Sequence, residues 1–314
     1  MSSSSQRIVI TGGAGLVGQN LVVALLDADY SNILVIDKSS SNLNVLAEMH
    51  PGVEVIHADL AIEGDWQLSL SHASVVVSLH AQIGGLQVTE FEANNITATR
   101  NVLRALQENS DCQLVHVSTS AVNSTADDNY TRTKTQQEKL VTESATRWMV
   151  LRPTLMFGWF DRKHLGWLSR FMKKSPIFPV PGHGGYLRQP LYAADFCQVI
   201  ISCIRQEITG ASVEISGKEK IPYLDIIRAV RESTRSRTPI VRIPYSMFYL
   251  LLKIYALFDR DPPFTVSQLK ALVVDELFED ADWETLFSVR ATPFKQAIEQ
   301  TFTHPQYSAI ELEF

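Results

Sequence analysis

The chain has 314 residues, of which 45% are hydrophobic and 20% are charged, and its formal net charge is −6. This balance is typical of a globular protein and excludes a disordered chain. The excess of negative charge, with no cluster of lysine and arginine to offset it, excludes nucleic-acid binding as the main activity. The length suffices for one large domain, or for a large and a small one.

Cysteine usage and the first residues indicate a reducing compartment. Cys112, Cys197 and Cys203 lie in apolar runs and lack the spacing of metal ligands, so we expect buried thiols and no metal site. Residues 1–5 have no basic flank, and no long apolar core precedes the first strand, so a signal peptide is not expected. We therefore expect a cytoplasmic protein.

Short β-branched runs alternate with helical runs over residues 7–152, which is the pattern of a doubly wound parallel sheet. The clearest helix is expected over 97–107, where Val102, Leu103 and Leu106 recur at helical spacing. The predicted strands occupy residues 8–11, 33–37, 53–57, 75–79, 114–118 and 149–152. The fold class is therefore α/β, with a Rossmann-type sheet.

The first half of the chain is organised around a glycine-rich stretch, TGGAGLVG, which follows an apolar run and opens a helical one. A strand that turns through glycines into a helix leaves unpaired backbone N–H groups, which bind anions. The first glycine permits the tight turn, the second lets a pyrophosphate approach the backbone, and the third lets the helix pack on the strand. The predicted dinucleotide contacts are Gly12, Gly15, Leu16, Val17 and Gly18.

Asp37 ends the second predicted strand, roughly 20 residues beyond the last glycine, where an adenosine ribose offers its 2′-hydroxyl. A carboxylate at this place accepts hydrogen bonds from the ribose and repels a 2′-phosphate, so the expected cofactor is NAD rather than NADP. The neighbouring Lys38 could instead pair with that phosphate, which keeps NADP as the less favoured alternative.

After Pro153 the composition of the chain changes, and glycine, proline and aromatic residues become frequent. We expect residues 1–155 to form the dinucleotide-binding domain and residues 156–314 to form a smaller substrate-binding domain over the carboxyl edge of the sheet. Residues 186–205 are expected to return to the Rossmann core.

Two late helices are expected, over 245–258 and 264–277. The first is apolar, but it is too short to span a membrane and is interrupted by Lys253. Packing in a core or a dimer interface is favoured for it over contact with lipid.

Residues with hydroxyl groups follow the fifth predicted strand, and Tyr130 and Lys134 come after them at a spacing of four. This spacing places both on one helical face, where an ammonium can act on a phenol. Because the reference pKa of tyrosine is about 10, we expect the lysine and a nicotinamide ring to favour the phenolate as a base. A serine hydroxyl alongside, that of Ser120, can hold the reacting oxygen of a substrate.

Together these motifs resemble the extended short-chain dehydrogenase/reductases of the nucleotide-sugar epimerase and dehydratase family. The resemblance covers nearly the whole chain. It rests on TGGAGLVG, Asp37, Asp59–Leu60, LHAQ at 79–82, Asn95, VSTSA at 117–121, YTRTK at 130–134 and LRPT at 151–154.

The resemblance implies roles for individual residues. Tyr130 would be the catalytic base, Lys134 its activator and a nicotinamide-ribose ligand, and Ser120 the hydroxyl on the substrate oxygen, with Thr119 a weaker candidate.

Arg188 matches the arginine that binds the substrate diphosphate in sugar-nucleotide relatives; the alternative is a surface ion pair. A second diphosphate-binding arginine has no clear counterpart, and Arg290 is only a guess. The resemblance also implies that Asp59 and Leu60 contact the adenine, Ala81 the diphosphate and ribose, and Pro153 the carboxamide of the cofactor. Further implied cofactor contacts, without a stated part of the cofactor, are Lys38, Gln82, Asn95 and Ser118. Gln82 is also expected to contact the substrate.

The sequence also departs from the family pattern. The segment between Ser120 and Tyr130 is shorter than in most extended members, which disfavours a standard galactose-type epimerase. Ala121 stands within the place where sugar dehydratases carry an acidic pair, which disfavours dehydration. His80 is interpreted equally well as a core histidine and as a catalytic one.

Three functions remain open. The leading hypothesis is NAD-dependent epimerisation of a nucleoside-diphosphate sugar through a transient keto intermediate, in surface-polysaccharide synthesis. The second is a net ketoreductase or dehydrogenase on a nucleotide sugar or a 3β-hydroxysteroid-like alcohol. The third is a dinucleotide-binding subunit without turnover. A homodimer is expected by analogy, formed by the helix after Asn95 and the helix that carries Tyr130.

Overall fold

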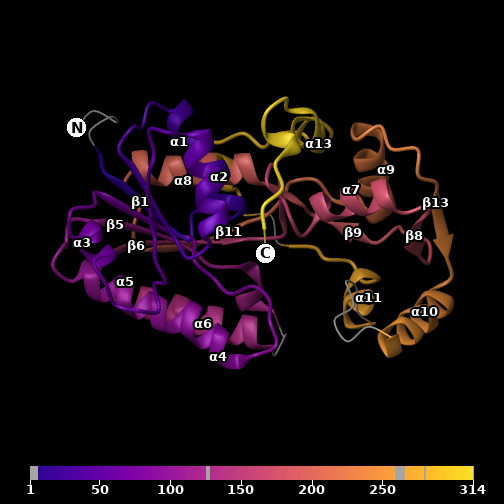
Figure 1. Ribbon diagram of the computed structural model, residues 1–314, viewed down its shortest axis with the longest axis horizontal. Coiled ribbons are helices and arrows are strands. Elements are labelled where there is room, and N and C mark those ends of the chain that lie inside the picture. Colours follow the sequence, from indigo (N-terminus) through magenta and orange to yellow (C-terminus); the bar gives the residue numbers. More distant parts are fainter. Residues whose placement is uncertain (1–5, 125–127, 259–265, 279–280, 314) are drawn as a thin grey trace.

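The computed structural model describes residues 6–124, 128–258, 266–278 and 281–313. Figure 1 shows two units side by side: a helix-covered sheet, here called the sheet unit, and a smaller unit beyond the carboxyl edge of the sheet, here called the cap. Among the described residues, no helix is both long and apolar enough to cross a membrane.

The sheet unit contains a seven-stranded sheet in the order β11-β6-β5-β4-β1-β2-β3, in which all neighbouring strands are parallel. The strands are β1 (Ile8–Thr11), β2 (Ile33–Asp37), β3 (Glu54–His57), β4 (Val75–Ser78), β5 (Gln113–Val117), β6 (Arg147–Pro153) and β11 (Ala211–Ile215). The predicted doubly wound α/β fold is therefore confirmed. All predicted strands are present, and their ends shift by at most one or two residues.

β11 is the strand that the sequence did not reveal. It pairs with β6 alone, at the edge of the sheet, and most of its side chains are only partly buried. Its five residues therefore lack the continuous apolar run that marks the central strands.

The predicted helix over 97–107 is α5 (Ala98–Leu106), which continues a π-helix, η2 (Glu92–Thr97). The apolar helix predicted over 245–258 is α10 (Tyr245–Phe258). The last predicted helix is shorter than expected: α11 spans Val266–Leu272, and residues 264 and 265 lie outside the described residues. The Arg188 side chain donates to carbonyls at its C-terminal end, as described below.

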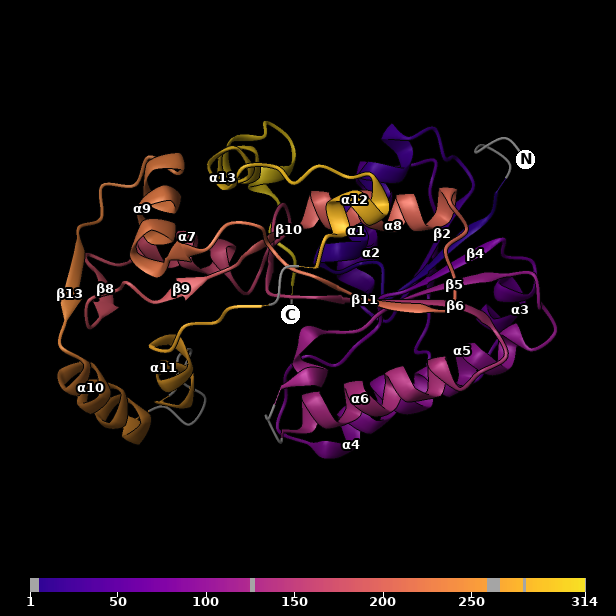
Figure 2. The same cartoon turned by 180° about the vertical axis from the view of Figure 1, so that it is seen from behind.

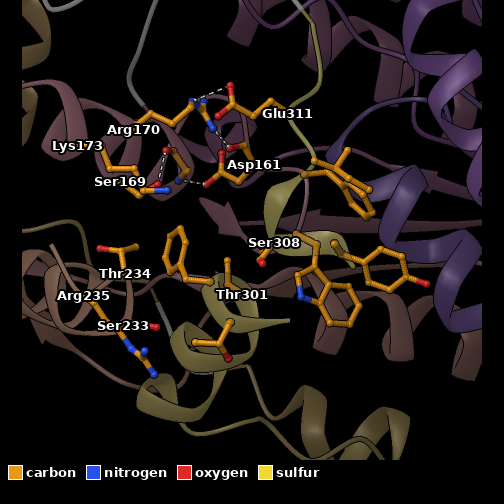
Figure 3. Close-up of a pocket in the computed structure, with 18 residues that line it drawn as sticks. Asp161, Ser169, Arg170, Lys173, Ser233, Thr234, Arg235, Thr301, Ser308 and Glu311 are labelled. Carbon is orange, nitrogen blue, oxygen red and sulfur yellow. Dashed lines mark hydrogen bonds and ion pairs between the residues drawn. The ribbon is translucent and has the colours of Figure 1, made fainter. Parts of the chain in front are cut away.

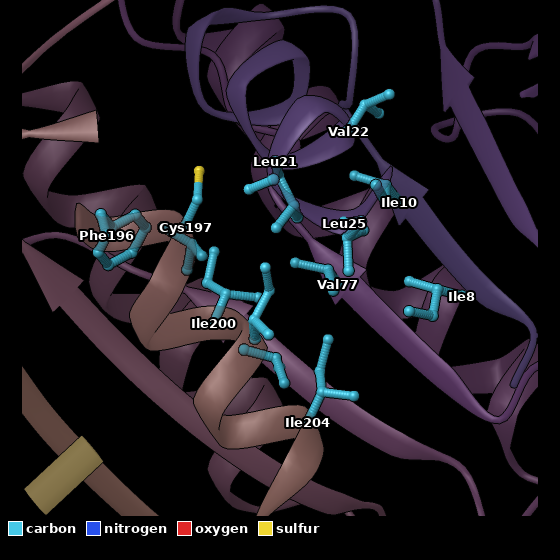
Figure 4. Packing of buried hydrophobic residues seen from close by; sticks show 14 of the residues in the cluster. Ile8, Ile10, Leu21, Val22, Leu25, Val77, Phe196, Cys197, Ile200 and Ile204 are labelled. Carbon is cyan, nitrogen blue, oxygen red and sulfur yellow. The ribbon is translucent and has the colours of Figure 1, made fainter. Parts of the chain in front are cut away.

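Helices cover both faces of the sheet because the central strands are apolar on both sides. Ile8 and Ile10 face one layer, which packs α1 (Leu16–Asp27) against α8 (Ala193–Arg205) and is shown in Figure 4. The intervening Val9 faces the opposite layer, formed by α3 (Trp66–Ser71), α5 and α6 (Asn129–Thr142). The parallel strands therefore lie between two apolar layers, as burial on both faces requires.

The cap has a core of its own. It is built from α7 (Leu165–Lys174), α9 (Tyr223–Ser233) and α13 (Phe294–Thr303) around Phe157, Val180 and Tyr192. Its strands form three pairs of two: β7 (Met156–Phe157) with β10 (Leu191–Tyr192), β8 (Phe178–Pro181) with β13 (Ile240–Ile243), and β9 (Leu187–Arg188) with β12 (Ile221–Pro222). With such short pairings, the packing of helices holds the cap together.

Later parts of the chain return to the sheet unit. α12 (Trp283–Phe287) packs its two buried aromatic side chains into the layer beside α8. The C-terminal segment then reaches α2 (Ser40–Met49), where the Asn42 side chain donates to and accepts from the backbone of Glu313. The two units are therefore joined by several crossings of the chain, which hold the cap over the carboxyl edge of the sheet.

Candidate active site

The strand order reverses between β1 and β4, and in open parallel sheets ligands bind at the carboxyl ends of the strands at such a point. β1 runs there into the glycine loop, and α1 begins with Gly15 as its N-cap. Gly12 has a φ of +70°, and a Cβ on it would lie 2.5 Å from the backbone of His80. A Cβ on Gly18 would lie 2.2 Å from the carbonyl oxygen of Gly13. The turn and the helix packing thus require glycine at these two positions.

Gly15 is different. The nearest atom to a Cβ built there is the carbonyl oxygen of Gly12, at 3.9 Å. The fold therefore tolerates a side chain at Gly15. Leu16 and Val17 follow it in the first turn of α1, where backbone N–H groups have no partner within the helix. An anion that approaches this helix start meets an uncovered backbone, as the pyrophosphate site requires.

Asp37 lies at the end of β2 beside the glycine loop. One carboxylate oxygen accepts a hydrogen bond from the backbone of Ala14 at 3.0 Å, and the other accepts one from the backbone of Ser39 at 2.9 Å. The side chain therefore ties the loop to the turn after β2. Each oxygen retains acceptor capacity, which suits it to a ribose hydroxyl.

The other residues predicted to contact the adenosine lie along the same edge. The Lys38 ammonium donates to the Asn94 side chain at 2.9 Å, so it is directed toward η2. Asp59 accepts from the backbone of Ala61 at 2.9 Å, and Leu60 is buried. This places an apolar side chain and a carboxylate directly after β3.

The turn after β4 is held by Asn95. The Asn95 side-chain oxygen accepts from the backbone of Gln82 at 2.6 Å, and its amide donates to the Thr133 hydroxyl at 2.9 Å. Asn95 sits in the π-helical turn of η2, fully buried. It therefore fixes the Ala81–Gln82 backbone against α6, the helix that carries Tyr130.

α6 positions Tyr130 and Lys134 at its start. The Asp128 side chain caps this helix by accepting from the backbone of Thr131 at 2.8 Å. Lys134 lies one turn after Tyr130, and its ammonium donates to the Val117 carbonyl at 2.9 Å and to the Gln137 side chain at 2.5 Å. The helix cap and these two bonds hold Lys134 in one place beneath the end of β5.

Burial shifts the pKa of both Tyr130 and Lys134. Burial raises the pKa of Tyr130, and a hydrogen bond with Thr119 opposes this shift. Burial lowers the pKa of Lys134 to about 7, and the Glu138 carboxylate opposes that shift. The Lys134 ammonium is directed at Val117 and Gln137, and desolvation is the largest cause of both shifts. Stabilisation of the phenolate by Lys134 together with a nicotinamide ring stays a prediction.

The hydroxyl residues after β5 take different places. Thr119 makes the hydrogen bond with the phenol of Tyr130, while Ser120 opens the short helix η3 (Ser120–Asn123). Ser118 is buried, and its backbone donates to Leu151 on β6 at 2.8 Å. Pro153 is buried at the end of β6, opposite Ile215. Thr119, the weaker candidate from the sequence, is thus the hydroxyl that contacts Tyr130.

A charged network that the sequence did not reveal supports Lys134. Glu138 lies one turn further along α6 and pairs with Arg152 on β6 at 2.5 Å, and Arg152 also pairs with Glu214 on β11 at 3.1 Å. The pairing with Arg152 lowers the pKa of Glu138 against the effect of its burial. The spacing of four between Lys134 and Glu138 was the one signal in the sequence that could have identified Glu138.

His80 belongs to a buried polar chain. One ring nitrogen lies 2.8 Å from the Thr11 hydroxyl and the other 3.0 Å from the Thr99 hydroxyl. Burial, and then the charge of Lys134, lowers the pKa of His80 to about 3. The imidazole is therefore neutral at physiological pH, with both nitrogens engaged. This favours the interpretation of His80 as a core histidine.

Comparison with protein families identifies the family to which the chain belongs. A family model described as the NAD dependent epimerase/dehydratase family matches residues 8–215. The chain belongs to this family. The family depends on NAD, as the sequence predicted, and its members of known activity are enzymes of the extended short-chain dehydrogenase type.

Individual relatives of this family member are distant. The mitochondrial NADH dehydrogenase [ubiquinone] 1 alpha subcomplex subunit 9 of Dictyostelium discoideum is 23% identical over 83% of this chain and 73% of that protein. A 3 beta-hydroxysteroid dehydrogenase/Delta 5→4-isomerase of Mycobacterium tuberculosis is 25% identical over 76% and 72%. Among solved structures, a UDP-N-acetylglucosamine 4-epimerase from Methanobrevibacter ruminantium superposes with a TM-score of 0.72 at 18% identity, over 94% and 96% of the two chains.

Arg188, which was predicted to bind the substrate diphosphate, is already bonded to other groups of the chain. Its guanidinium donates to the carbonyls of Ala271 at 3.2 Å, Leu272 at 2.5 Å and Val274 at 2.7 Å, and lies 3.7 Å from the Glu276 carboxylate. Arg188 thus caps the C-terminus of α11, where the helix dipole is negative. Arg290, the other arginine considered, is exposed after α12.

A cavity of about 370 Å³ lies between α7, α9, α13 and the C-terminal segment (Figure 3). Arg170, Lys173 and Arg235 lie around it, and Arg170 is within 4.0 Å of Glu311. The lining contains none of the residues predicted to bind cofactor or substrate. The cavity is therefore separate from the candidate active site.

Proposed function

We propose that this protein oxidises and reduces a secondary alcohol carbon, with Tyr130 as the acid–base residue. The observation that carries the proposal is the placement of Tyr130 and Lys134 one turn apart at the start of α6, where Thr119 meets the phenol. NAD, when bound, supplies the hydride acceptor and donor. The uncovered backbone at Gly15 and the carboxylate of Asp37 fit its pyrophosphate and ribose.

In this proposal the phenol oxygen of Tyr130 exchanges a proton with the substrate oxygen, donating it in reduction and accepting it in oxidation. The Thr119 hydroxyl, with Ser120 next to it, orients that oxygen. Lys134 supplies positive charge whenever it is protonated, and its pKa of about 7 lets it change charge near neutral pH. Burial raises the pKa of Tyr130, and the hydrogen bond with Thr119 opposes this shift, so Thr119 favours the phenolate that oxidation requires.

Within this chemistry the first candidate reaction is epimerisation of a nucleoside-diphosphate sugar through a transient keto intermediate. The family and the likeness to a UDP-N-acetylglucosamine 4-epimerase support it. Residues 1–155 would bind the dinucleotide and residues 156–314 would cover the substrate, with 186–205 returned to the core. We place the reaction in the cytoplasm, and a dimer would form through α5 and α6.

The second candidate is a net ketoreductase or dehydrogenase that acts on a less polar alcohol. The observation that favours it is Arg188, because the carbonyls of α11 already occupy the donors that a diphosphate would need. Similarity to a 3 beta-hydroxysteroid dehydrogenase also supports it. A binding subunit without turnover is less favoured, since it would not need Tyr130, Lys134 and Thr119 together.

Product analysis separates these candidates. The protein is incubated with NAD and a panel of UDP-, GDP- and dTDP-hexoses, and the products are examined by NMR while NADH absorbance is followed. A new sugar isomer without net NADH supports epimerisation. Net NADH, or turnover that requires a keto substrate and NADH, supports the second candidate. Bound NAD with no turnover on sugars, hydroxysteroids or other secondary alcohols would contradict the catalytic proposal.

Arg188→Gln decides the class of substrate. If a diphosphate displaces the α11 carbonyls, the variant raises KM for the nucleotide sugar about tenfold or more, as expected for a lost charge-assisted contact. For a less polar alcohol, KM stays within about twofold. Arg104→Gln, which removes an exposed arginine on the far side of the sheet unit, is the matched control.

A further inference from the structure

α10 is an apolar helix that the rest of the protein hardly covers. None of its side chains described, over residues 245–255, is buried. Met247, Leu250, Leu251, Ile254 and Tyr255 recur at spacings of three and four, and each is 45% to 56% exposed. They therefore form one continuous stripe on the helix surface, here called the α10 stripe.

The other sides of α10 are accounted for within the chain. Phe248 and Leu252 are half-buried, and the helix packs against α11. On a further face the Tyr245 and Tyr249 rings lie 6.2 Å apart, with the Lys253 ammonium 5.0 Å from the centre of the Tyr249 ring. The α10 stripe is thus turned away from the cap core, with tyrosines and a lysine beside it.

The charge around this helix is opposite to that of the whole chain. β13 and α10, residues 240–258, contain the basic residues Arg242 and Lys253 and no aspartate or glutamate, although the net charge of the chain is −6. Both basic side chains are exposed. An apolar stripe bordered by basic side chains and tyrosines is complementary to an anionic lipid surface.

A second copy of the chain fits this surface less well. A stable protein interface buries roughly 800 Å² on each partner, more than five half-covered side chains can offer. Pairing two copies through the stripe would also bring four basic side chains together, Arg242 and Lys253 of each copy, and like charges repel. An anionic bilayer fits the surface better, because the apolar side chains can insert into its interior and its anionic headgroups neutralise the basic side chains.

The position of the stripe agrees with this choice. In Figures 1 and 2, α10 and α4 (Val88–Phe91) lie on the same side of the molecule, one on each unit. Just before α4, Leu86 is 93% exposed and Ile83 is also exposed. α4 contacts α6, the helix that carries Tyr130. The sheet unit therefore also carries exposed apolar residues on the side of the molecule where α10 lies.

We propose that α10 binds the surface of an anionic lipid bilayer, lying in its plane with the α10 stripe inserted. The helix is too short to cross the bilayer, so the protein associates from one side. This inference does not depend on the reaction that the site performs. Bilayer binding can be measured in the absence of substrate, so its failure and the failure of the proposed function are separate results.

The test is co-flotation of the full chain with vesicles of phosphatidylcholine alone or mixed with phosphatidylglycerol. We expect binding to the mixed vesicles that weakens as salt is added. Leu250→Ser with Ile254→Ser should weaken binding at least about tenfold through lost apolar contact. Arg242→Gln with Lys253→Gln should weaken it about fivefold per charge.

Matched controls carry the same changes away from α10. Ile62→Ser with Leu68→Ser removes two exposed apolar side chains of the sheet unit, and Arg100→Gln with Arg104→Gln removes two exposed arginines of α5. Both controls should bind like the wild type, and all variants should keep the wild-type melting temperature and NAD affinity. Absence of binding to mixed vesicles would overturn the proposal. So would a dimer, seen by light scattering, that only the Leu250 and Ile254 double variant dissociates, because the stripe would then serve a second copy.

Discussion

The sheet unit and the cap solve the problem of burial in different ways. In the sheet unit, successive side chains along each strand point into two apolar layers, one on each face of the sheet. β1, β2 and β4 are almost wholly buried. The cap has one small core, three two-stranded pairings and an apolar helix left exposed. The buried strands of the sheet unit fix the backbone of the candidate site, whereas the cap carries the exposed α10. We therefore expect the reaction and the binding of a partner to depend on different residues.

The largest effect is expected from removing the proposed acid–base group, Tyr130. Tyr130→Phe should lower kcat by about 10²–10⁴-fold, as loss of a general acid–base residue does, and leave NAD affinity within a few-fold. Tyr249→Phe, on the exposed α10, should leave kcat unchanged. Steady-state kinetics and NAD titration measure both. A Tyr130→Phe variant as active as the wild type would contradict the role of Tyr130 as the acid–base residue.

Packing density is tested by truncating one isoleucine in each unit. Ile200→Ala, in the layer between α1 and α8, should cost about 2–5 kcal/mol of unfolding free energy by leaving a cavity. Ile254→Ala, on the α10 stripe, should change it by less than about 0.5 kcal/mol. Urea denaturation measures both. Equal losses would mean that α10 is covered by protein in solution.

The glycine loop contains one glycine that the fold requires, Gly18, and one that the bound dinucleotide is expected to require, Gly15. Gly18→Ala should destabilise the protein by about 1–3 kcal/mol, because the new methyl would overlap the Gly13 backbone. Gly15→Ala should leave stability near that of the wild type and weaken NAD binding, since its Cβ meets no atom within 3.4 Å. Gly52→Ala, in open space, is the control. Equal effects of Gly15→Ala and Gly18→Ala on stability would contradict this separation.

The buried Lys134 predicts a dependence of stability on pH. Its pKa is about 7 in the folded protein, below the value of about 10.4 in an unfolded chain. Between these values the unfolded chain binds a proton that the folded chain does not, so unfolding free energy rises with pH, by up to about 1.4 kcal/mol per unit. Lys134→Met should be the more stable protein near pH 7, with the gap closing as pH rises. Parallel pH profiles in urea denaturation would argue against a neutral Lys134.

The smallest expected effect concerns cofactor choice. Asp37→Ala should reduce the preference for NAD over NADP by about tenfold, because the carboxylate that repels a 2′-phosphate is lost. A small loss of stability should accompany it, since Ala14 and Ser39 lose their acceptor. Binding of both dinucleotides is compared by fluorescence titration. Unchanged discrimination would mean that another residue, such as Lys38, sets the preference.

Much of the sheet unit could be predicted because its signals are local. The glycine spacing, the β-branched runs and the acid after β2 each report a backbone requirement within a few residues of themselves. The same holds for Tyr130 and Lys134, whose spacing places them on one helical face. The edge strand β11 was missed because a partly buried strand of five residues carries little local pattern.

The amino-acid sequence by itself determined the α/β class, the glycine loop and the residues of the candidate site, because these follow from short-range periodicity and backbone freedom. Only the tertiary structure decided that Thr119 meets Tyr130, that Arg188 caps α11, that Glu138 and Arg152 stand behind Lys134, and that α10 is exposed. These are contacts between segments far apart in the chain. Burial and desolvation depend on what the whole fold packs around a side chain, and no local pattern records that.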